Sequence, residues 1–105
     1  MGLYVIQYRY PSDRKFMVED FRPFHRTHMR ELQEKGLLLA SGFLSDAMFD
    51  GAMMILRANS AQEAESLLEG DAFYDSGLMA DLIIRSWVPT LGAEAPDFDT
   101  EFPVS

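Results

Sequence analysis

Four short segments rich in aliphatic, aromatic and β-branched residues, separated twice by amphipathic stretches, constrain the fold of this chain more than any other feature. Residues 3–10 form the first segment, and the loop signature Pro-Ser-Asp at 11–13 ends it. The segments at 37–44 and 51–58 follow each other closely, which predicts a hairpin. The last segment spans 79–88. We therefore expect four strands.

Two helices are predicted between these strands. Pro23 is suited to a first helical position and Gly36 to a left-handed cap, so we expect a helix over 22–35. The second helix is expected to begin at the capping box Ser60-Ala61-Gln62-Glu63 and to run to Glu69, before Gly70.

The order strand, helix, strand, strand, helix, strand predicts an α+β, ferredoxin-like βαββαβ fold, with a four-stranded antiparallel sheet and both helices on one face. The central hairpin is expected to turn at Asp50-Gly51. The other sheet face would then lack cover, although strands such as residues 3–8 are apolar on both sides. Monomers rarely expose such a face, so we expect a homodimer in which the two sheet faces meet.

Charge and cysteine content narrow the class of protein. The formal net charge is −8, and the nine Lys and Arg are scattered along the chain, so neither nucleic acid nor a membrane surface is an expected partner. The absence of cysteine excludes disulfides, a thiolate nucleophile and Cys-based metal sites. The N-terminal residues contain no basic region and no long apolar run, so we expect a cytoplasmic protein.

The domain division is expected to be one domain over 1–90 and an acidic tail over 91–105. The tail has acidic but no basic residues, which favours a solvated end. Phe98 and Phe102 leave open a second possibility, that the tail is a strap that docks on a partner subunit or closes a pocket.

The two histidines, His25 and His28, lie early in the first predicted helix. At 100° per residue His25 falls at the centre of the apolar stripe that includes Met29 and Leu32, so it should face the sheet. His28 falls outside the stripe and is expected at the surface or at the rim of a pocket. A buried imidazole can be either a satisfied core residue or a functional group.

Other chemistry-bearing patterns are sparse. Asp71 follows Gly70 and is placed to cap the next short segment. His25 and His28 could share a metal only with further ligands, which the sequence does not provide, so no metal is expected. No phosphate loop, serine elbow or dinucleotide fingerprint is present, and we expect no cofactor.

Six motifs follow one another along the chain: Arg22-Pro23-Phe24-His25, residues 32–44 with the run Gly-Leu-Leu-Leu-Ala-Ser-Gly-Phe-Leu at 36–44, Asp50-Gly51, residues 58–64, Asp71-Ala72-Phe73 and Ser76-Gly77-Leu78. In this order and spacing they resemble the YCII family over about residues 3 to 88.

The resemblance implies a ferredoxin-like fold that forms a dimeric α/β barrel, with a His and an Asp close together in a pocket between sheet and helices. By motif position these are His25 and Asp71. A paired carboxylate would fix the imidazole tautomer. The family commonly has Pro after this Asp, where this chain has Ala72, so the backbone here lacks the fixed φ with which a proline favours a helix start.

These features together predict a small-molecule enzyme that uses His25 and Asp71 for cofactor-independent general acid-base chemistry on a small, ring-derived organic acid or phenol. The reaction class is isomerase or lyase, partly by analogy with muconolactone isomerase-like enzymes. The expected substrate contacts complete the site: Arg22, Ser41, Phe73 and His28.

Two other functions remain open at this point. One is a non-catalytic dimeric module that binds a small ligand or a protein. The other is an oxygenase of the dimeric α/β barrel type, with or without haem.

Overall fold

The computed structural model describes residues 1–92, and the tail predicted over 91–105 lies almost entirely outside them, so the domain division stays a prediction. Seven elements follow one another along the chain: β1 (Gly2–Arg9), α1 (Lys15–Glu34), β2 (Leu38–Ser45), β3 (Asp50–Ala58), α2 (Ala61–Ser66), α3 (Ala72–Ser76) and β4 (Asp81–Trp87).

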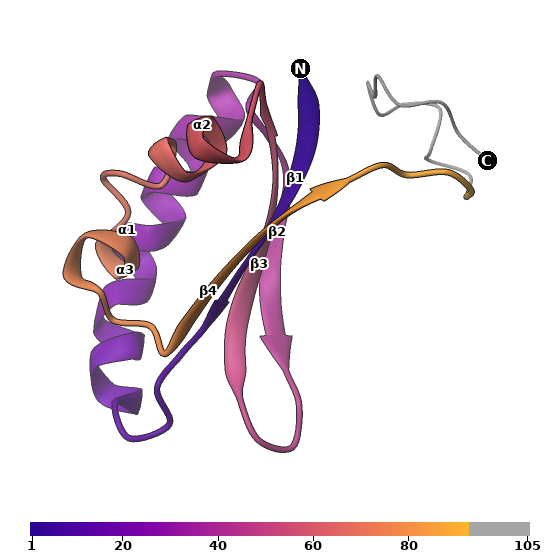
Figure 1. The fold of residues 1–105 in the computed structure, drawn as a ribbon. Coiled ribbons are helices and arrows are strands. Elements are labelled where there is room, and N and C mark those ends of the chain that lie inside the picture. Colours follow the sequence, from indigo (N-terminus) through magenta and orange to yellow (C-terminus); the bar gives the residue numbers. More distant parts are fainter. Residues whose placement is uncertain (93–105) are drawn as a thin grey trace.

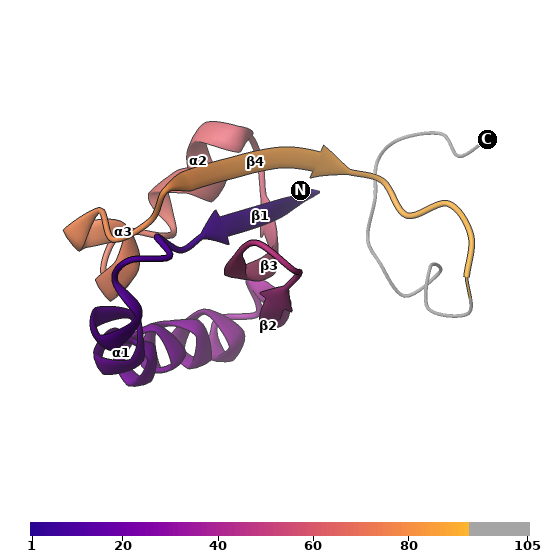
Figure 2. The ribbon, with the colours of Figure 1, turned by 90° about the horizontal axis from the view of Figure 1, so that it is seen from below.

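The four strands form one antiparallel sheet in the order β2-β3-β1-β4. The three helices of residues 1–92 lie on one face of this sheet, and no helix of that range covers the other face (Figure 1). Viewed from below, α1 runs along the β2 half of the sheet, while α2 lies behind β4 (Figure 2). The predicted α+β fold with four antiparallel strands is confirmed.

The core lies between the sheet and the helices. Alternate residues of the two central strands point into it, because successive side chains of a strand face opposite sides. Ile6 and Tyr8 of β1 and Met54 and Leu56 of β3 are almost completely buried there. Helix α1 contributes a stripe of buried side chains to the same layer: Val18, His25, Met29 and Leu32.

Helix α1 begins at Lys15, so the prediction that it starts near residue 22 is wrong. Pro23 lies inside the helix and not at its first position. The buried stripe starts at Val18 and continues through His25 across the proline, so packing against the sheet outweighs the one backbone hydrogen bond that Pro23 cannot donate.

The hairpin also turns earlier than predicted. Asp50 and Gly51 belong to β3, where they pair with Ser45 and Leu44. The turn is closed instead by Asp46, whose Oδ1 accepts hydrogen bonds of 2.7 Å from the backbone N–H groups of Met48 and Phe49. The connection from β2 to β3 covers residues 46–49, so it is longer than the two-residue loop that an Asp-Gly turn would require.

Two later boundaries differ from the expectation. Helix α2 ends at Ser66 instead of Glu69, because the next residues form tight turns such as the bond from the N–H of Asp71 to the carbonyl of Leu68. Strand β4 begins at Asp81 instead of 79, because the N–H of Met79 is bonded within a turn to Gly77.

A β-bulge in β2 decides which of its side chains face the helices. Leu38 pairs with Leu56 and faces the core, but the register shifts between Leu38 and Ala40. One extra residue reverses the alternation that follows it. Ser41 and Phe43, which would otherwise face the uncovered side, therefore pair with the core-facing Met54 and Ala52 and lie on the helix side.

No helix within residues 1–92 has both the length and the apolar character needed to cross a bilayer. The cytoplasmic location expected from the sequence stays a prediction.

Two glycines in the hairpin provide a test of this packing. A Cβ on Gly51 would overlap the backbone carbonyl of Tyr8, whereas a Cβ on Gly42 would meet open space. We expect Gly51→Ala to lower the free energy of unfolding by about 1–3 kcal/mol, because the strands must move apart. The matched Gly42→Ala should change it by less than about 0.5 kcal/mol. Urea unfolding of both variants checks this, and equal effects would contradict the described register.

Candidate active site

A cavity of about 440 Å³ lies between α1 and the β2–β3 edge of the sheet. The wall formed by α1 carries arginines and His25, and the wall formed by β2 carries small and apolar residues. Its lining comprises Tyr10, Arg22, His25, Arg26, Met29, Arg30, Gln33, Leu38, Leu39, Ala40, Ser41, Gly42, Phe43, Gly51 and Ala52. A concave space of this size, with few convergent polar groups, is typical of a small-molecule site.

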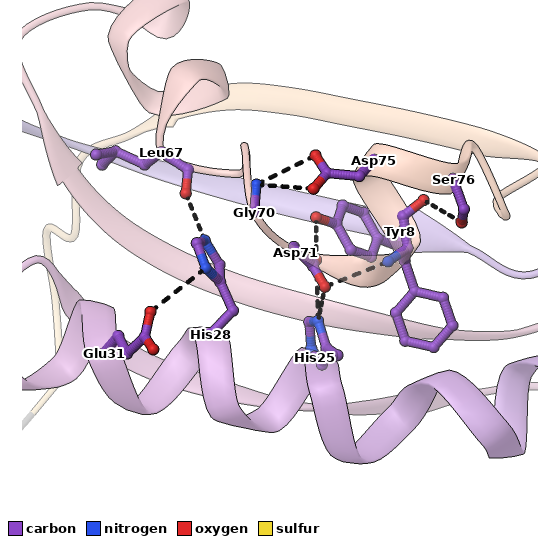
Figure 3. Close-up of polar contacts among 10 residues, drawn as sticks. Tyr8, His25, His28, Glu31, Leu67, Gly70, Asp71, Asp75 and Ser76 are labelled. Atoms are coloured by element: carbon purple, nitrogen blue, oxygen red, sulfur yellow. Dashed lines mark hydrogen bonds and ion pairs between the residues drawn. The ribbon is translucent and has the colours of Figure 1, made fainter.

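His25 and Asp71 are in direct contact at the base of this cavity. The Nδ1 atom of His25 lies 3.0 Å from each carboxyl oxygen of Asp71 (Figure 3). The His25 side chain is 7% exposed and that of Asp71 is fully buried. Because an ionised carboxylate only accepts hydrogen bonds, Nδ1 carries the hydrogen, and in the neutral imidazole the lone pair is on Nε2.

The Nε2 atom of His25 is open to the cavity. Within residues 1–92 no buried side-chain nitrogen or oxygen lacks a hydrogen-bond partner, and no residue of that range bonds to Nε2. The small exposed part of the side chain therefore includes Nε2, and His25 is among the residues that line the cavity. The pair thus presents one ring nitrogen to a ligand while the other is held by the carboxylate.

The backbone around Asp71 explains how it reaches α1. Gly70 has a φ of +99°, which a residue with a Cβ rarely adopts, and it redirects the chain after the tight turns that follow α2. Asp71 is then extended and caps α3, with Oδ1 3.4 Å from the N–H of Phe73. The predicted cap and the predicted contact with His25 are thus made by the same carboxylate. Helix α3 begins at Ala72 even without the proline of the family pattern.

Tyr8 is a third member of this cluster that the sequence analysis missed. Its hydroxyl donates a hydrogen bond of 2.6 Å to Oδ2 of Asp71, across 63 residues of sequence (Figure 3). The signal available was weak: a tyrosine on the core face of a strand needs a buried partner for its hydroxyl. The sequence gives no indication of which residue that partner is.

Burial raises the pKa of both tyrosines at this end of β1. For Tyr8 loss of hydration is the largest cause, and the negative charge of Asp71 and the hydrogen bond to it raise the pKa further. For Tyr10 loss of hydration together with Asp71 raises the pKa to about 12, although Arg22 opposes this shift. Both phenols therefore remain neutral hydrogen-bond donors throughout the physiological range.

Only some of the four predicted substrate contacts line the cavity. Arg22 and Ser41 line the cavity, and Arg22 lies over the ring of Phe43, 5.5 Å from its centroid. Phe73 is fully buried and does not line the cavity, but its ring packs 5.4 Å from that of His25 and so supports the imidazole.

His28 also lies away from the cavity, and the expectation of a surface or rim position is wrong. Its Nε2 atom is 2.8 Å from the carbonyl oxygen of Leu67, and its side chain is 13% exposed (Figure 3). This bond ties the turn after α2 to α1, three residues from His25, and so helps to hold Asp71 in place. The helical-wheel argument failed because α3 and the turn after α2 cover a flank of α1 that the sheet does not.

No three His, Asp or Glu side chains in the described part of the chain come together as a metal site would require. The predicted absence of a metal and of an organic cofactor stays a prediction.

The chain belongs to the YCII family: the model of the YCII-related domain matches residues 3–88. No curated protein sequence matches the chain.

Among solved structures the chain is similar to 5-chloro-2-hydroxyhydroquinone dehydrochlorinase from Burkholderia phenoliruptrix AC1100, in complex with 2,5-dihydroxybenzoquinone. The TM-score is 0.70 at 24% sequence identity, and the match covers 81% of this chain and 92% of the dehydrochlorinase chain. At this identity the likeness establishes a shared fold.

The buried tyrosines predict how stability depends on pH. Above their ordinary pKa of 10.0 both phenols ionise in the unfolded chain but stay protonated in the fold, so raising the pH favours unfolding. Between pH 10 and about 12 the free energy of unfolding should fall by about 1.4 kcal/mol per pH unit for each tyrosine. Urea unfolding across this window should show about half the slope in Tyr8→Phe. An unchanged slope would contradict the described burial.

Proposed function

We propose that this protein is a small-molecule enzyme that performs cofactor-independent general acid-base chemistry, of the isomerase or lyase type, on a small ring-derived organic acid or phenol. The single observation that carries the proposal is the arrangement of His25, with Nδ1 held by the buried Asp71 and Nε2 open to the cavity. An imidazole that is fixed on one side and accessible on the other is the arrangement that proton transfer requires.

In the proposed reaction Nε2 of His25 takes a proton from a ring hydroxyl or from an acidic C–H of the substrate. The electron pair left behind forms a carbonyl or an enolate. Return of the proton to a ring carbon gives the keto tautomer and completes an isomerisation. Where that carbon carries a halide, loss of a proton from a second, conjugated hydroxyl then expels the halide ion and leaves a quinone, which completes a lyase reaction. Asp71 orients the ring and faces the positive charge that His25 acquires.

The substrate class is supported by the cavity and by the structural neighbour. The Phe43 ring, Met29 and Leu38 offer apolar contact to a flat ring, while the Tyr10 phenol and the Ser41 hydroxyl offer hydrogen bonds. The dehydrochlorinase of similar fold acts on a chlorinated hydroxyhydroquinone and binds a dihydroxybenzoquinone. We therefore place chlorinated hydroxyphenols and small lactones first among the candidate substrates.

The decisive experiment compares turnover of these candidates by the wild type, His25→Ala and Asp71→Asn. We expect both variants to lose about 10²- to 10⁴-fold in kcat. Asp71→Asn keeps the shape of the side chain but can donate to Nδ1, which would place the hydrogen on Nε2 and remove the base. Release of halide or the change in ultraviolet absorbance of the ring measures the rate.

Asp75→Asn is the matched control, because it neutralises a carboxylate of the same short helix outside the cavity. Its amide oxygen can still accept the hydrogen bond from the N–H of Gly70. Turnover that is unchanged in both His25→Ala and Asp71→Asn would show that the protein uses other groups, and a wild type that binds these candidates without converting any of them would show a binding module.

We also propose that the chain forms a homodimer through the sheet face that carries no helix. Strand register places three cross-strand rows of β3, β1 and β4 on this face: Arg57–Leu3–Trp87, Ile55–Val5–Arg85 and Met53–Gln7–Ile83. Most of these side chains are apolar. Leu3 and Ile55 are already buried within the chain, whereas Ile83 is 38% exposed. A second copy of the chain would bury this surface, as the family resemblance implies.

The dimer predicts a specific effect of Ile83→Asp. Light scattering after size exclusion should give the wild type about twice the monomer mass of 11.9 kDa. Ile83→Asp should weaken association at least about 100-fold, because burying an unpaired carboxylate costs several kcal/mol. Phe16→Asp introduces the same charged residue in place of an 89% exposed apolar residue of α1, and this variant should stay dimeric. A monomeric wild type, or equal effects of both variants, would refute this interface.

A further inference from the structure

Three of the nine basic residues of the chain line one cavity. Arg22, Arg26 and Arg30 follow one another at intervals of four along α1, so they form one row on the helix. The row extends over about 12 Å, at a rise of about 1.5 Å per residue. None of the residues that line the cavity is Asp or Glu, although the chain carries seventeen of these acids. The cavity is therefore cationic in a protein of net charge −8.

Acidic side chains of the protein neutralise only part of the positive charge of this row of arginines. Arg22 pairs with Glu19, with Nη1 2.7 Å from Oε1, and it also stacks near Phe43. Within residues 1–92 no acidic side chain pairs with Arg26 or Arg30. Like charges four residues apart on a helix are mutually unfavourable. Two guanidinium groups are thus free to bind an anion at the end of the cavity away from Arg22.

The position of the row relative to His25 defines the ligand further. Arg26 follows His25 directly, and Arg30 lies one turn beyond it, about 7.5 Å along the helix axis from His25. Gln33 adds a neutral amide at the Arg30 end of the cavity. Met29 and the β2 wall supply apolar contacts between the imidazole and the guanidinium groups. A ligand that fits this pattern has a flat apolar body with an acidic group at the end opposite its reacting atom.

We propose that Arg26 and Arg30 hold the acidic group, a carboxylate or a similarly ionised oxygen, of a ring-derived anionic ligand whose ring lies beside Nε2 of His25. This anion site rests on the proposed function only in that both use the same cavity. It restricts the substrates of the proposed enzyme to anions. A guanidinium binds a carboxylate through paired N–H donors, so two adjacent arginines select for charge as well as for shape.

The test measures binding without turnover, with para-hydroxybenzoate and its neutral amide, para-hydroxybenzamide, as probes. Both share the ring and the phenol and differ in charge. Calorimetric titration of the wild type should give at least about 10-fold tighter binding of the carboxylate. The double variant Arg26→Gln/Arg30→Gln should reduce this preference to about 2-fold or less, with little change in affinity for the amide. Raising NaCl from about 50 mM to about 300 mM should weaken carboxylate binding by the wild type.

The matched control is Arg14→Gln/Lys35→Gln, which removes the same charge from the two ends of α1, outside the cavity. It should keep the preference for the carboxylate. Equal binding of the two probes by the wild type, no saturable binding of the carboxylate, or an equal loss of preference in the control would each overturn the proposal.

The outcome is separable from that of the acid-base proposal. A charge preference that depends on Arg26 and Arg30, with turnover that His25→Ala leaves intact, would support the anion site and remove the proton-transfer mechanism. Turnover that depends on His25, with no charge preference, would do the reverse.

Discussion

The hydrogen bonds that converge on the Asp71 carboxylate are the interaction on which the rest of the site depends. Oδ2 accepts from the Tyr8 hydroxyl, Oδ1 caps α3 through Phe73, and both oxygens lie 3.0 Å from Nδ1 of His25. One buried group thus joins β1, α1 and α3, three elements that are remote in sequence. A buried carboxylate is costly unless its oxygens are satisfied, so the position of each partner is strongly constrained.

The sequence predicted the local features of this arrangement. The angular position of His25 on α1 showed that its ring faces inward, and the place of Asp71 after Gly70 showed that it caps a helix. The alternation of strands and helices predicted the fold class correctly. Each of these inferences depends on neighbours within a few residues, where helical and strand periodicity are informative.

Features that depend on distant contacts could not be predicted in this way. Tyr8 and Asp71 are 63 residues apart, and only the packed fold shows that the phenol reaches the carboxylate. The start of α1 was missed because Pro23 is a strong local signal, whereas the stripe that extends the helix to Lys15 is stabilised by packing on the sheet. The bulge that directs Ser41 and Phe43 into the cavity leaves no clear local signature.

The charges around the cavity are arranged as two opposed poles. Asp71 lies beneath the imidazole and faces the positive charge that His25 would acquire, while Arg26 and Arg30 line the wall where a ligand's negative charge would lie. In the proposed reaction a proton moves from the reacting atom toward the first pole, while the acidic group at the opposite end of the ligand stays at the second. Groups that are already oriented need no rearrangement when charge separates, which is the main way that a protein lowers the barrier to such a step. The same fold that buries Asp71 to hold His25 also orients α1 so that Arg26 and Arg30 line the same cavity.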